Sequence, residues 1–224
     1  RVRHWVLVFA ATLSIITYID RVCISKFAPA IKTELVLTDV QMGWVFAAFA
    51  WAYALFEIPG GWLGDKIGPR KVLMRVVIMW SFFTAATGWA WNLASMIVCR
   101  FLFGAGEAGA FPNLTKAFHR WLPLHERSRA QGIMWMSARL GGAFTPGLVF
   151  LCLHYVTWRQ AFLLFGLLQI SHLFAAREVL DYAAANGGSD SILLLWRGET
   201  LRRLGLTSGM HFLDVGAGTG FFSR

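Results

Sequence analysis

Six apolar segments, each about as long as an α-helix must be to cross a lipid bilayer, recur in the first three quarters of the chain. A hydrocarbon layer about 30 Å thick takes roughly 20 helical residues. Lipid offers the backbone no hydrogen-bond partners, so such segments must pair their own N–H and C=O groups, and their length and composition favour helices over barrel strands. We therefore predict an all-α membrane bundle over residues 1–176, with spans at residues 4–19, 40–59, 72–91, 93–111, 130–151 and 157–176.

Composition supports a membrane protein, since 57% of the residues are hydrophobic and 15% are charged, which is more apolar than a single soluble domain requires. The net charge of +9 does not indicate a nucleic-acid partner, because the basic residues lie in short gaps between apolar segments and not on one soluble face. The cysteines Cys23, Cys99 and Cys152 are odd in number and far apart, which argues against a disulfide framework or a metal site.

The positions of the lysines and arginines predict the orientation of the bundle, because cytoplasmic gaps between membrane helices are enriched in basic residues. If the N-terminus is cytoplasmic, the gaps on that side hold ten basic residues and the gaps on the other side hold three. The ten are Arg1, Arg3, Lys66, Arg70, Lys71, Arg75, Lys116, Arg120, Arg127 and Arg129, and the three are Lys26, Lys32 and Arg159. We therefore expect a multi-pass protein of the inner (plasma) membrane with a cytoplasmic N-terminus.

The gap between the second and third predicted spans, residues 61–71, has the sequence GWLGDKIGPRK. Small residues at this spacing let helix ends approach closely, and an acid there can pair with a cation or a helix N-terminus and so hold one conformation. The segment resembles the signature of the major facilitator superfamily. The resemblance implies a conformational motif made of Gly61, Asp65, Lys66, Gly68, Arg70 and Lys71. The alternative is a basic loop that only orients the helices.

Further segments are similar to the anion:cation symporter family of that superfamily. They are residues 18–21 (YIDR), 49–53 (FAWAY), 100–108 (RFLFGAGEA), 121–127 (WLPLHER) and 158–159 (WR). The resemblance implies secondary transport, in which protons or sodium ions drive uptake of a sugar acid or another organic carboxylate without a cofactor. It also implies that the chain lies in the lipid bilayer as the N-terminal six-helix half of a transporter, whose second half completes the substrate site.

Charged side chains inside membrane spans need an explanation, because each costs at least about 2.5–3.5 kcal/mol at the centre of a bilayer. Asp20, Arg21, Arg100, Glu107 and Arg139 lie in or at the end of the predicted spans. Arg100 and Glu107 are seven positions apart, so they share one face of a helix with about 10 Å of rise between them. We therefore expect both to face a polar cavity between helices.

The family resemblance implies roles for these side chains. Asp20 and Glu107 are expected to carry the coupling protons, because burial favours a neutral carboxyl group and a nearby guanidinium favours a charged one. The substrate anion is expected to contact Arg21, Arg100, Arg139, Tyr18 and Tyr53. The alternative is that the charged residues only form ion pairs that link helices. The identity of the anion stays open, because Ala138 stands where some sugar-acid transporters carry a substrate-binding amide.

The composition changes after residue 176, where residues 177–190 form a polar, turn-prone linker. Residues 191–224 begin with an amphipathic segment that predicts a short soluble helix. Residues 210–220 then predict a strand and a glycine-rich turn, and they resemble motif I of class I S-adenosylmethionine-dependent methyltransferases, the start of a Rossmann-like α/β domain. The implied cofactor-binding residues are Asp214, Gly216, Gly218 and Gly220.

This C-terminal piece is too short to be an active enzyme, so S-adenosylmethionine would be a cofactor only if the domain were complete. A chain that opens at Arg1 and joins half a transporter to the start of a methyltransferase is expected to be a fragment or a chimeric gene model, with a genuine fusion as the alternative. Two further functions stay open at this point: a membrane-tethered methyltransferase, and a half-bundle that serves as an anchor without transporting anything.

Overall fold

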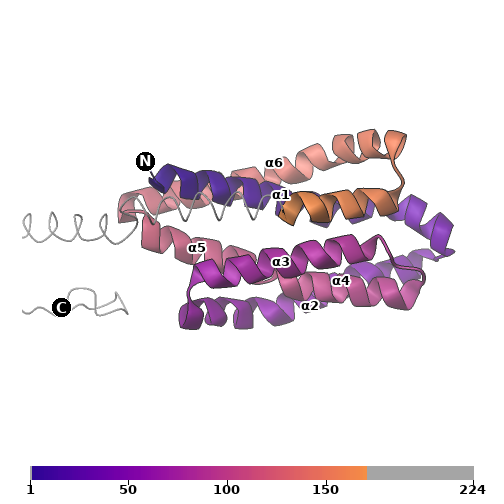
Figure 1. Ribbon diagram of the computed structural model, residues 1–224, viewed down its shortest axis with the longest axis horizontal. Coiled ribbons are helices and arrows are strands. Elements are labelled where there is room, and N and C mark those ends of the chain that lie inside the picture. Colours follow the sequence, from indigo (N-terminus) through magenta and orange to yellow (C-terminus); the bar gives the residue numbers. More distant parts are fainter. Residues whose placement is uncertain (1, 171–224) are drawn as a thin grey trace, which may run out of the picture. The chain divides into compact units, whose positions relative to one another are not determined.

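The structure is a computed structural model that describes residues 2–170, with side chains described from Val6 onward. Within that range the chain is helical apart from short connections (Figure 1). The helices are α1 (Val2–Leu35), α2 (Asp39–Ile67), α3 (Pro69–Thr87), α4 (Leu93–Glu107), α5 (Ala110–Trp121), α6 (Leu124–Tyr155) and a further helical segment at residues 158–170. The predicted all-α bundle is confirmed for this part, whereas the predicted linker and methyltransferase-like segment, residues 177–224, lie outside it.

Local capping sequences determine where α2, α3 and α4 begin. At the start of α2, the Thr38 hydroxyl accepts a hydrogen bond from the Gln41 N–H at 3.2 Å, and the Gln41 amide oxygen accepts one from the Thr38 N–H at 2.9 Å. This reciprocal arrangement is a capping box, and Asn92 caps α4 in the same manner. Gly68 separates α2 from α3 with a φ of +88°, which L side chains rarely adopt, and Pro69 opens α3.

The first, second, fourth and fifth predicted spans are each part of a longer helical stretch. The first was predicted to end at residue 19, but α1 continues through Asp20 and Arg21 to Leu35. The fourth, predicted at residues 93–111, comprises α4 and α5 and runs to Trp121, with a short turn at residues 108–109. In both stretches the helix continues past charged residues, among them Arg21, which pairs with Glu107, and Lys116, which pairs with Asp65.

Among residues 2–170, four helical stretches are long and apolar enough to cross a membrane: Val6–Leu35, Asp39–Ile67, Leu93–Trp121 and Leu124–Tyr155. The shorter α3 carries Arg70, Lys71 and Arg75 near its start, and the segment at residues 158–170 continues to the last described residue. Large apolar side chains cover the outside of the bundle; Ile58 and Phe150, for example, are 81% and 80% exposed. An apolar exterior of this kind is expected for helices that face lipid.

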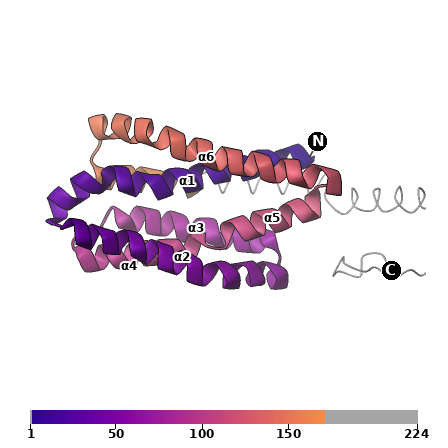
Figure 2. The ribbon, with the colours of Figure 1, turned by 180° about the vertical axis from the view of Figure 1, so that it is seen from behind.

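The helices pack in pairs at glycine residues. α1 runs along α6, α2 lies along α4, and α3 lies against α4 and α5 (Figures 1 and 2). A Cβ atom added at Gly104 of α4 would lie 2.7 Å from the carbonyl oxygen of Phe49 in α2, and one added at Gly141 of α6 would overlap the Ile15 backbone of α1. Small residues at such crossings let membrane helices approach closely enough to pack without an aqueous driving force.

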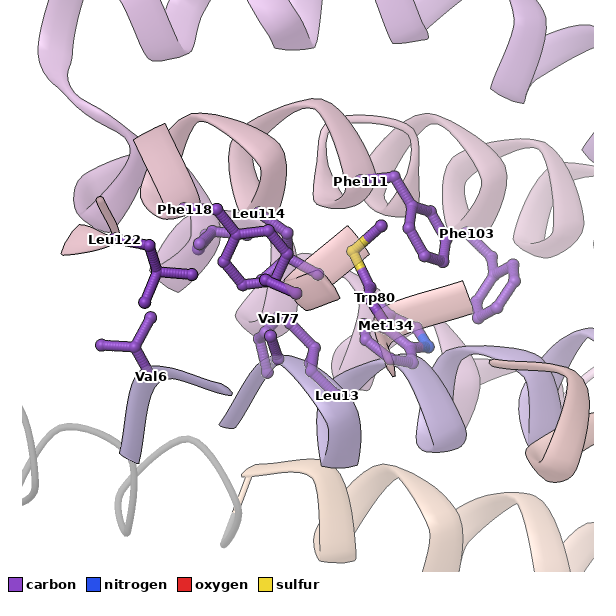
Figure 3. Close-up of a cluster of buried hydrophobic side chains, with 13 residues drawn as sticks. Val6, Leu13, Val77, Trp80, Phe103, Phe111, Leu114, Phe118, Leu122 and Met134 are labelled. Atoms are coloured by element: carbon purple, nitrogen blue, oxygen red, sulfur yellow. The ribbon is translucent and has the colours of Figure 1, made fainter. Parts of the chain in front are cut away.

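A polar layer divides the apolar core. One buried cluster joins Val6 and Leu13 of α1 to side chains of α3, α4, α5 and α6, and Figure 3 shows it extending from Val6 and Leu122 to Phe103, with Trp80 beside Met134. A second cluster contains the later α1 residues Cys23 to Ile31. Between the two, α1 carries four polar residues, namely Ser14, Thr17, Asp20 and Arg21. The two hydroxyls bond carbonyl oxygens of their own helix, so the charged residues are the ones that need partners from other helices.

Arg159 ties three segments together at the end of the bundle where α3 is connected to α4. Its Nε donates to Glu34 Oε1 at 2.6 Å, and one of its Nη atoms donates to the carbonyl oxygens of Gly88 and Ala90 at 2.9 and 2.7 Å. The Trp158 indole N–H donates to the other Glu34 oxygen at 2.6 Å. One carboxylate and one guanidinium therefore hold the end of α1, the α3–α4 connection and the start of the 158–170 segment.

Candidate functional site

Asp20 of α1 lies in the polar layer and is 1% exposed. Its Oδ2 atom accepts hydrogen bonds from the Trp80 indole N–H of α3 at 2.6 Å and from the Gln169 amide at 2.5 Å. Its Oδ1 atom is buried and has no hydrogen-bond partner among the described residues. Two neutral donors therefore fix one oxygen of this carboxyl group, and the other oxygen is available to carry a proton.

Glu107, the last residue of α4, is fully buried and pairs with Arg21 of α1. The Arg21 Nε atom donates to Glu107 Oε1 at 2.5 Å. Within residues 2–170, neither Glu107 Oε2 nor Arg21 Nη2 has a hydrogen-bond partner. The ion pair links α1 to α4 but uses only one N–H and one oxygen, so it lacks the two parallel hydrogen bonds of a bidentate Arg–carboxylate pair.

Arg100 lies on the same face of α4 as Glu107 and is 2% exposed. Its guanidinium carbon is 4.2 Å from the ring centre of Phe103 and 5.5 Å from that of Phe49. It interacts electrostatically with Glu107 and Asp20, yet its Nη1 atom has no hydrogen-bond partner in the described part of the chain. A buried guanidinium with an unused donor favours the binding of an anion, which would satisfy both its charge and its N–H group.

Four aromatic rings surround the Arg21 guanidinium. Their centres lie between 4.3 and 5.6 Å from its central carbon, and they belong to Tyr53, Tyr18, Phe49 and Phe111. The negative faces of aromatic rings attract a cation without using its N–H donors. The rings therefore stabilise Arg21 inside the bundle and leave part of its hydrogen-bonding capacity free.

Arg139 of α6 completes the group, with its guanidinium carbon 6.0 Å from the Tyr18 ring centre. Unlike Arg21 and Arg100, Arg139 is exposed. The seven residues that the sequence predicted for proton coupling and substrate binding thus lie in one region, around the polar layer: Asp20, Glu107, Arg21, Arg100, Tyr18, Tyr53 and Arg139. Their roles stay predictions.

Trp80 and Gln169, which donate hydrogen bonds to Asp20, were not among the predicted site residues. A signal was present, because an indole N–H and an amide near the centres of apolar spans each need a polar partner in lipid. Their positions along the chain do not show which acceptor on another helix they meet. That information exists only in the packing of α3 and the 158–170 segment against α1.

The conformational motif lies at the end of the bundle where α2 meets α3 (Figure 1). The Asp65 carboxylate pairs with the Lys116 ammonium of α5 at 2.7 Å, and Lys116 also donates a hydrogen bond to the carbonyl oxygen of Gly61. Lys66 places its ammonium 4.3 Å from the ring centre of Trp62. The cation that the sequence led us to expect beside Asp65 is therefore Lys116, from the same bundle.

The site combines two buried carboxyl groups with three guanidinium groups. Carboxyl groups take up and release protons, and guanidinium groups bind carboxylates and other oxyanions through planar N–H pairs. Within residues 2–170, no three His, Cys, Asp or Glu side chains lie close enough together to hold a metal ion.

The residues predicted to bind S-adenosylmethionine, Asp214, Gly216, Gly218 and Gly220, lie outside the described residues.

The chain is similar to known transporters of organic anions. A probable sulfoacetate transporter of Cupriavidus necator is 46% identical over 166 residues, which are 74% of this chain and 39% of the relative. A D-galactonate transporter of Escherichia coli is 35% identical over 166 residues, which are again 74% of this chain and 39% of the relative. A hexuronate transporter of Bacillus subtilis is 31% identical over 159 residues, 71% of this chain and 38% of the relative. The chain thus spans about two fifths of the length of these relatives.

Solved structures share the fold of the described residues. A bacterial homologue of the human lysosomal transporter Spinster, in an inward-facing and unoccupied conformation, has a TM-score of 0.69 and 24% identity over 80% of this chain and 43% of its own. A proton:xylose symporter has a TM-score of 0.73 and 13% identity over 87% of this chain and 49% of its own. The family model of the Major Facilitator Superfamily matches residues 10–177, and the chain belongs to that superfamily.

Proposed function

We propose that the chain is the N-terminal six-helix half of an anion:cation symporter that moves a small organic anion together with protons across the inner membrane. The relatives support this substrate class, because sulfoacetate, D-galactonate and hexuronate are all organic anions. The fold supports a transporter in which two six-helix halves enclose the substrate near the middle of the membrane. The positions of Asp20 and Glu107, near the middle of the stretches Val2–Leu35 and Leu93–Trp121, support such a location for the polar layer.

The observation that carries the proposal is the ion pair between the partly buried Arg21 and the fully buried Glu107. While Glu107 is ionised, its charge balances that of Arg21. When Glu107 takes up a proton, Arg21 is left without a counter-charge, and a substrate carboxylate restores the balance. The proton and the anion therefore each favour the binding of the other, and this mutual coupling is what a symporter requires.

Asp20 provides a second proton site in this scheme. Trp80 can only donate a hydrogen bond, whereas the Gln169 amide can donate through its nitrogen or accept through its oxygen. Gln169 Oε1 is buried and has no partner among the residues described. If the amide rotates, this oxygen can accept a hydrogen bond from a protonated Asp20. The surroundings of Asp20 thus offer partners to both of its protonation states.

Asp65 and Lys116 take part in the conformational cycle under this proposal. The Asp65 side chain is 68% exposed although it pairs with Lys116, so a group on a second six-helix half can reach it. If the Asp65 carboxylate leaves Lys116 and pairs with such a group instead, the equilibrium between two conformations shifts. The size of the shift is the difference between the two interaction energies.

A cytoplasmic N-terminus is also part of the proposal. The start of α1, the α2–α3 connection and the α5–α6 connection lie at one end of the bundle (Figure 1). Exposed basic side chains gather at this end, including Arg70, Lys71, Arg75, Arg120 and Arg129. The excess of basic residues supports a cytoplasmic position for these connections. Labelling of single cysteines introduced at Arg129 and at Thr157 in right-side-out vesicles would distinguish the two ends.

Uptake into liposomes tests the function. The reconstituted protein is offered labelled sulfoacetate under an inward proton gradient, and we expect accumulation that stops when a protonophore removes the gradient. Glu107→Gln is expected to lose gradient-driven accumulation and to retain exchange of labelled for unlabelled anion, because an amide keeps the shape of the side chain but cannot carry the proton. Asp39→Asn, a change of an exposed acid at the start of α2, is the matched control and should accumulate the anion normally.

Two results would contradict the proposal. Gradient-driven accumulation by Glu107→Gln at the unmodified rate would show that Glu107 does not carry the coupling proton. Absence of anion flux at every pH for the unmodified protein would favour a half-bundle that does not transport.

A further inference from the structure

Glu57 is a carboxyl group inside α2 that takes part in none of the ion pairs found within residues 2–170. It is partly buried and lies ten residues before the end of α2, about 15 Å along a helix that is long and apolar enough to cross a membrane. A carboxyl group at this depth needs a polar partner. The partner that the described residues provide is the Tyr53 hydroxyl, which donates a hydrogen bond to Glu57 Oε1 at 3.4 Å.

Tyr53 also contacts the guanidinium group of Arg21. The Tyr53 ring centre lies 4.3 Å from the Arg21 guanidinium carbon, which is the shortest of the four ring contacts of that group. The two side chains interact electrostatically as well. Because Arg21 Nη2 has no hydrogen-bond partner among the described residues, an anion that binds to it would lie next to Tyr53. One tyrosine thus touches both Glu57 and the guanidinium expected to bind the anion.

The Tyr53 hydroxyl has one hydrogen atom and can donate only one hydrogen bond at a time. An ionised carboxylate accepts hydrogen bonds and cannot donate them, and a bond to a charged acceptor is about twice as strong as a bond to a neutral one. While Glu57 is ionised, the Tyr53 hydrogen therefore stays on the Glu57 side. The hydroxyl then presents its lone pairs to the Arg21 side, and lone pairs attract the guanidinium but repel an anion.

Protonation of Glu57 changes the direction of this hydrogen bond. A protonated carboxyl group can donate to the Tyr53 oxygen, so the Tyr53 hydrogen can turn away and be donated to an anion on Arg21. Two hydrogen atoms are involved: the proton that Glu57 takes from water, and the hydroxyl hydrogen that rotates about its C–O bond. No other bond forms or breaks, and the anion gains one hydrogen bond.

We infer that Glu57 is a positioning residue that controls the direction of the Tyr53 hydroxyl and so withholds a hydrogen-bond donor from the anion until Glu57 takes up a proton. This inference rests on the proposed function. It adds a third acid, besides Asp20 and Glu107, that links proton uptake to anion binding. Glu57 acts through Tyr53 and does not itself contact the anion.

Other charged groups come from the helices that pack on α2. They are Arg21 of α1, Arg100 and Glu107 of α4, Lys116 of α5, which bonds the Gly61 carbonyl oxygen one turn after Glu57, and Arg70, Lys71 and Arg75 at the start of α3. Because Glu107 is also expected to exchange a proton, the pH dependence of anion binding includes both acids. Only a comparison of variants under the same conditions isolates the contribution of Glu57.

Sulfoacetate binding to the purified protein in lipid nanodiscs tests the inference through a double-mutant cycle. Glu57→Leu removes the acceptor and frees the Tyr53 hydrogen, so we expect sulfoacetate to bind about 3- to 10-fold more tightly at neutral pH. Tyr53→Phe keeps the ring beside Arg21 and removes the hydroxyl. In the Tyr53→Phe background, Glu57→Leu should change the affinity by less than about 2-fold. Under acidic conditions the gain from Glu57→Leu should shrink, because Glu57 of the unmodified protein is then protonated.

The control is Asp39→Asn, which removes an exposed acid at the start of the same helix and should bind sulfoacetate as the unmodified protein does. An equal gain from Glu57→Leu in both backgrounds would overturn the inference, because Glu57 would then act by charge repulsion alone. Unchanged or weaker binding in Glu57→Leu, while the unmodified protein binds sulfoacetate, would overturn it and leave the proposed function standing. If the unmodified protein does not bind sulfoacetate, the anion site of the proposed function fails, and this inference fails with it.

Discussion

Arg21 and Glu107 are 86 residues apart in the sequence, and their side chains are joined by a hydrogen bond of 2.5 Å between Nε and Oε1. The bond places a positive and a negative charge side by side in the middle of a bundle whose exterior is apolar. Neither charge is balanced by any other ion pair within residues 2–170. This ion pair therefore contributes both to the contact between α1 and α4 and to the chemistry of the site.

Breaking this pair from one side should cost more stability than removing both partners. Arg21→Gln removes the hydrogen-bonded counter-charge of the buried Glu107 carboxylate, and we expect it to lower the free energy of unfolding by about 3–5 kcal/mol. The double variant Arg21→Gln/Glu107→Gln should be more stable than Arg21→Gln alone, because no isolated charge remains. Denaturant unfolding in detergent micelles measures the stability of both variants.

The exposed pair of Lys32 and Asp39 is the control, and its removal should change the free energy of unfolding by less than about 1 kcal/mol. Strictly additive effects at Arg21 and Glu107 would contradict the interpretation.

Trp80→Phe should weaken the bundle through Asp20. The phenyl ring keeps much of the apolar contact but removes the indole N–H, one of the two donors to Asp20 Oδ2. Loss of a hydrogen bond to a buried acceptor is expected to cost about 1–3 kcal/mol. The same change made in an Asp20→Asn background should cost less, because a neutral acceptor needs the donor less. Trp51→Phe is the control, since Trp51 is 74% exposed. An equal cost in both backgrounds would show that Trp80 acts by packing alone.

Arg159→Ala should loosen one end of the bundle without affecting anion binding. The change removes three hydrogen bonds, one to Glu34 and two to the backbone of the α3–α4 connection. Because the Arg159 side chain is 30% exposed, solvent screening lowers the expected loss of stability to about 1–2 kcal/mol. Hydrogen exchange should become faster at Gly88 and Ala90 in particular. Arg129→Gln is the control. Unchanged hydrogen exchange at the α3–α4 connection in Arg159→Ala would show that Arg159 does not hold this connection in place.

Lys116→Met should change the rate of transport more than the affinity for the anion. Lys116 pairs with Asp65 at 2.7 Å and also bonds the Gly61 carbonyl oxygen, so its loss frees the conformational motif from α5. We expect the maximal rate of uptake to fall several-fold while the substrate concentration at half-maximal rate changes by less than about 2-fold, because the motif lies at the end of α2 and the site residues lie at the polar layer. Lys26→Met, a change of an exposed lysine in α1, is the control. A changed affinity with an unchanged rate would place Lys116 in substrate binding instead.

The fold class could be predicted from the sequence because its causes are local. The length of an apolar segment determines whether it can cross a bilayer, and capping residues such as Thr38 and Gln41, or a turn glycine such as Gly68, act within a few residues of the helix end they determine. The sequence also marks Asp20 and Glu107 as residues that need polar partners inside the bundle, because a charge is costly in lipid; their roles in transport stay predictions.

Only the tertiary structure determines which of these side chains contact each other. From spacing, Glu107 and Arg100 share a face of α4, yet the hydrogen-bonded partner of Glu107 is Arg21 of α1. Likewise, the donors to Asp20 come from Trp80 and Gln169, 60 and 149 residues away. Partners across helices depend on how the helices cross, and the crossings depend on close contacts such as that of Gly104 with Phe49. A helix period relates residues within one helix, but it carries no information about the residue that the next helix brings to the same depth.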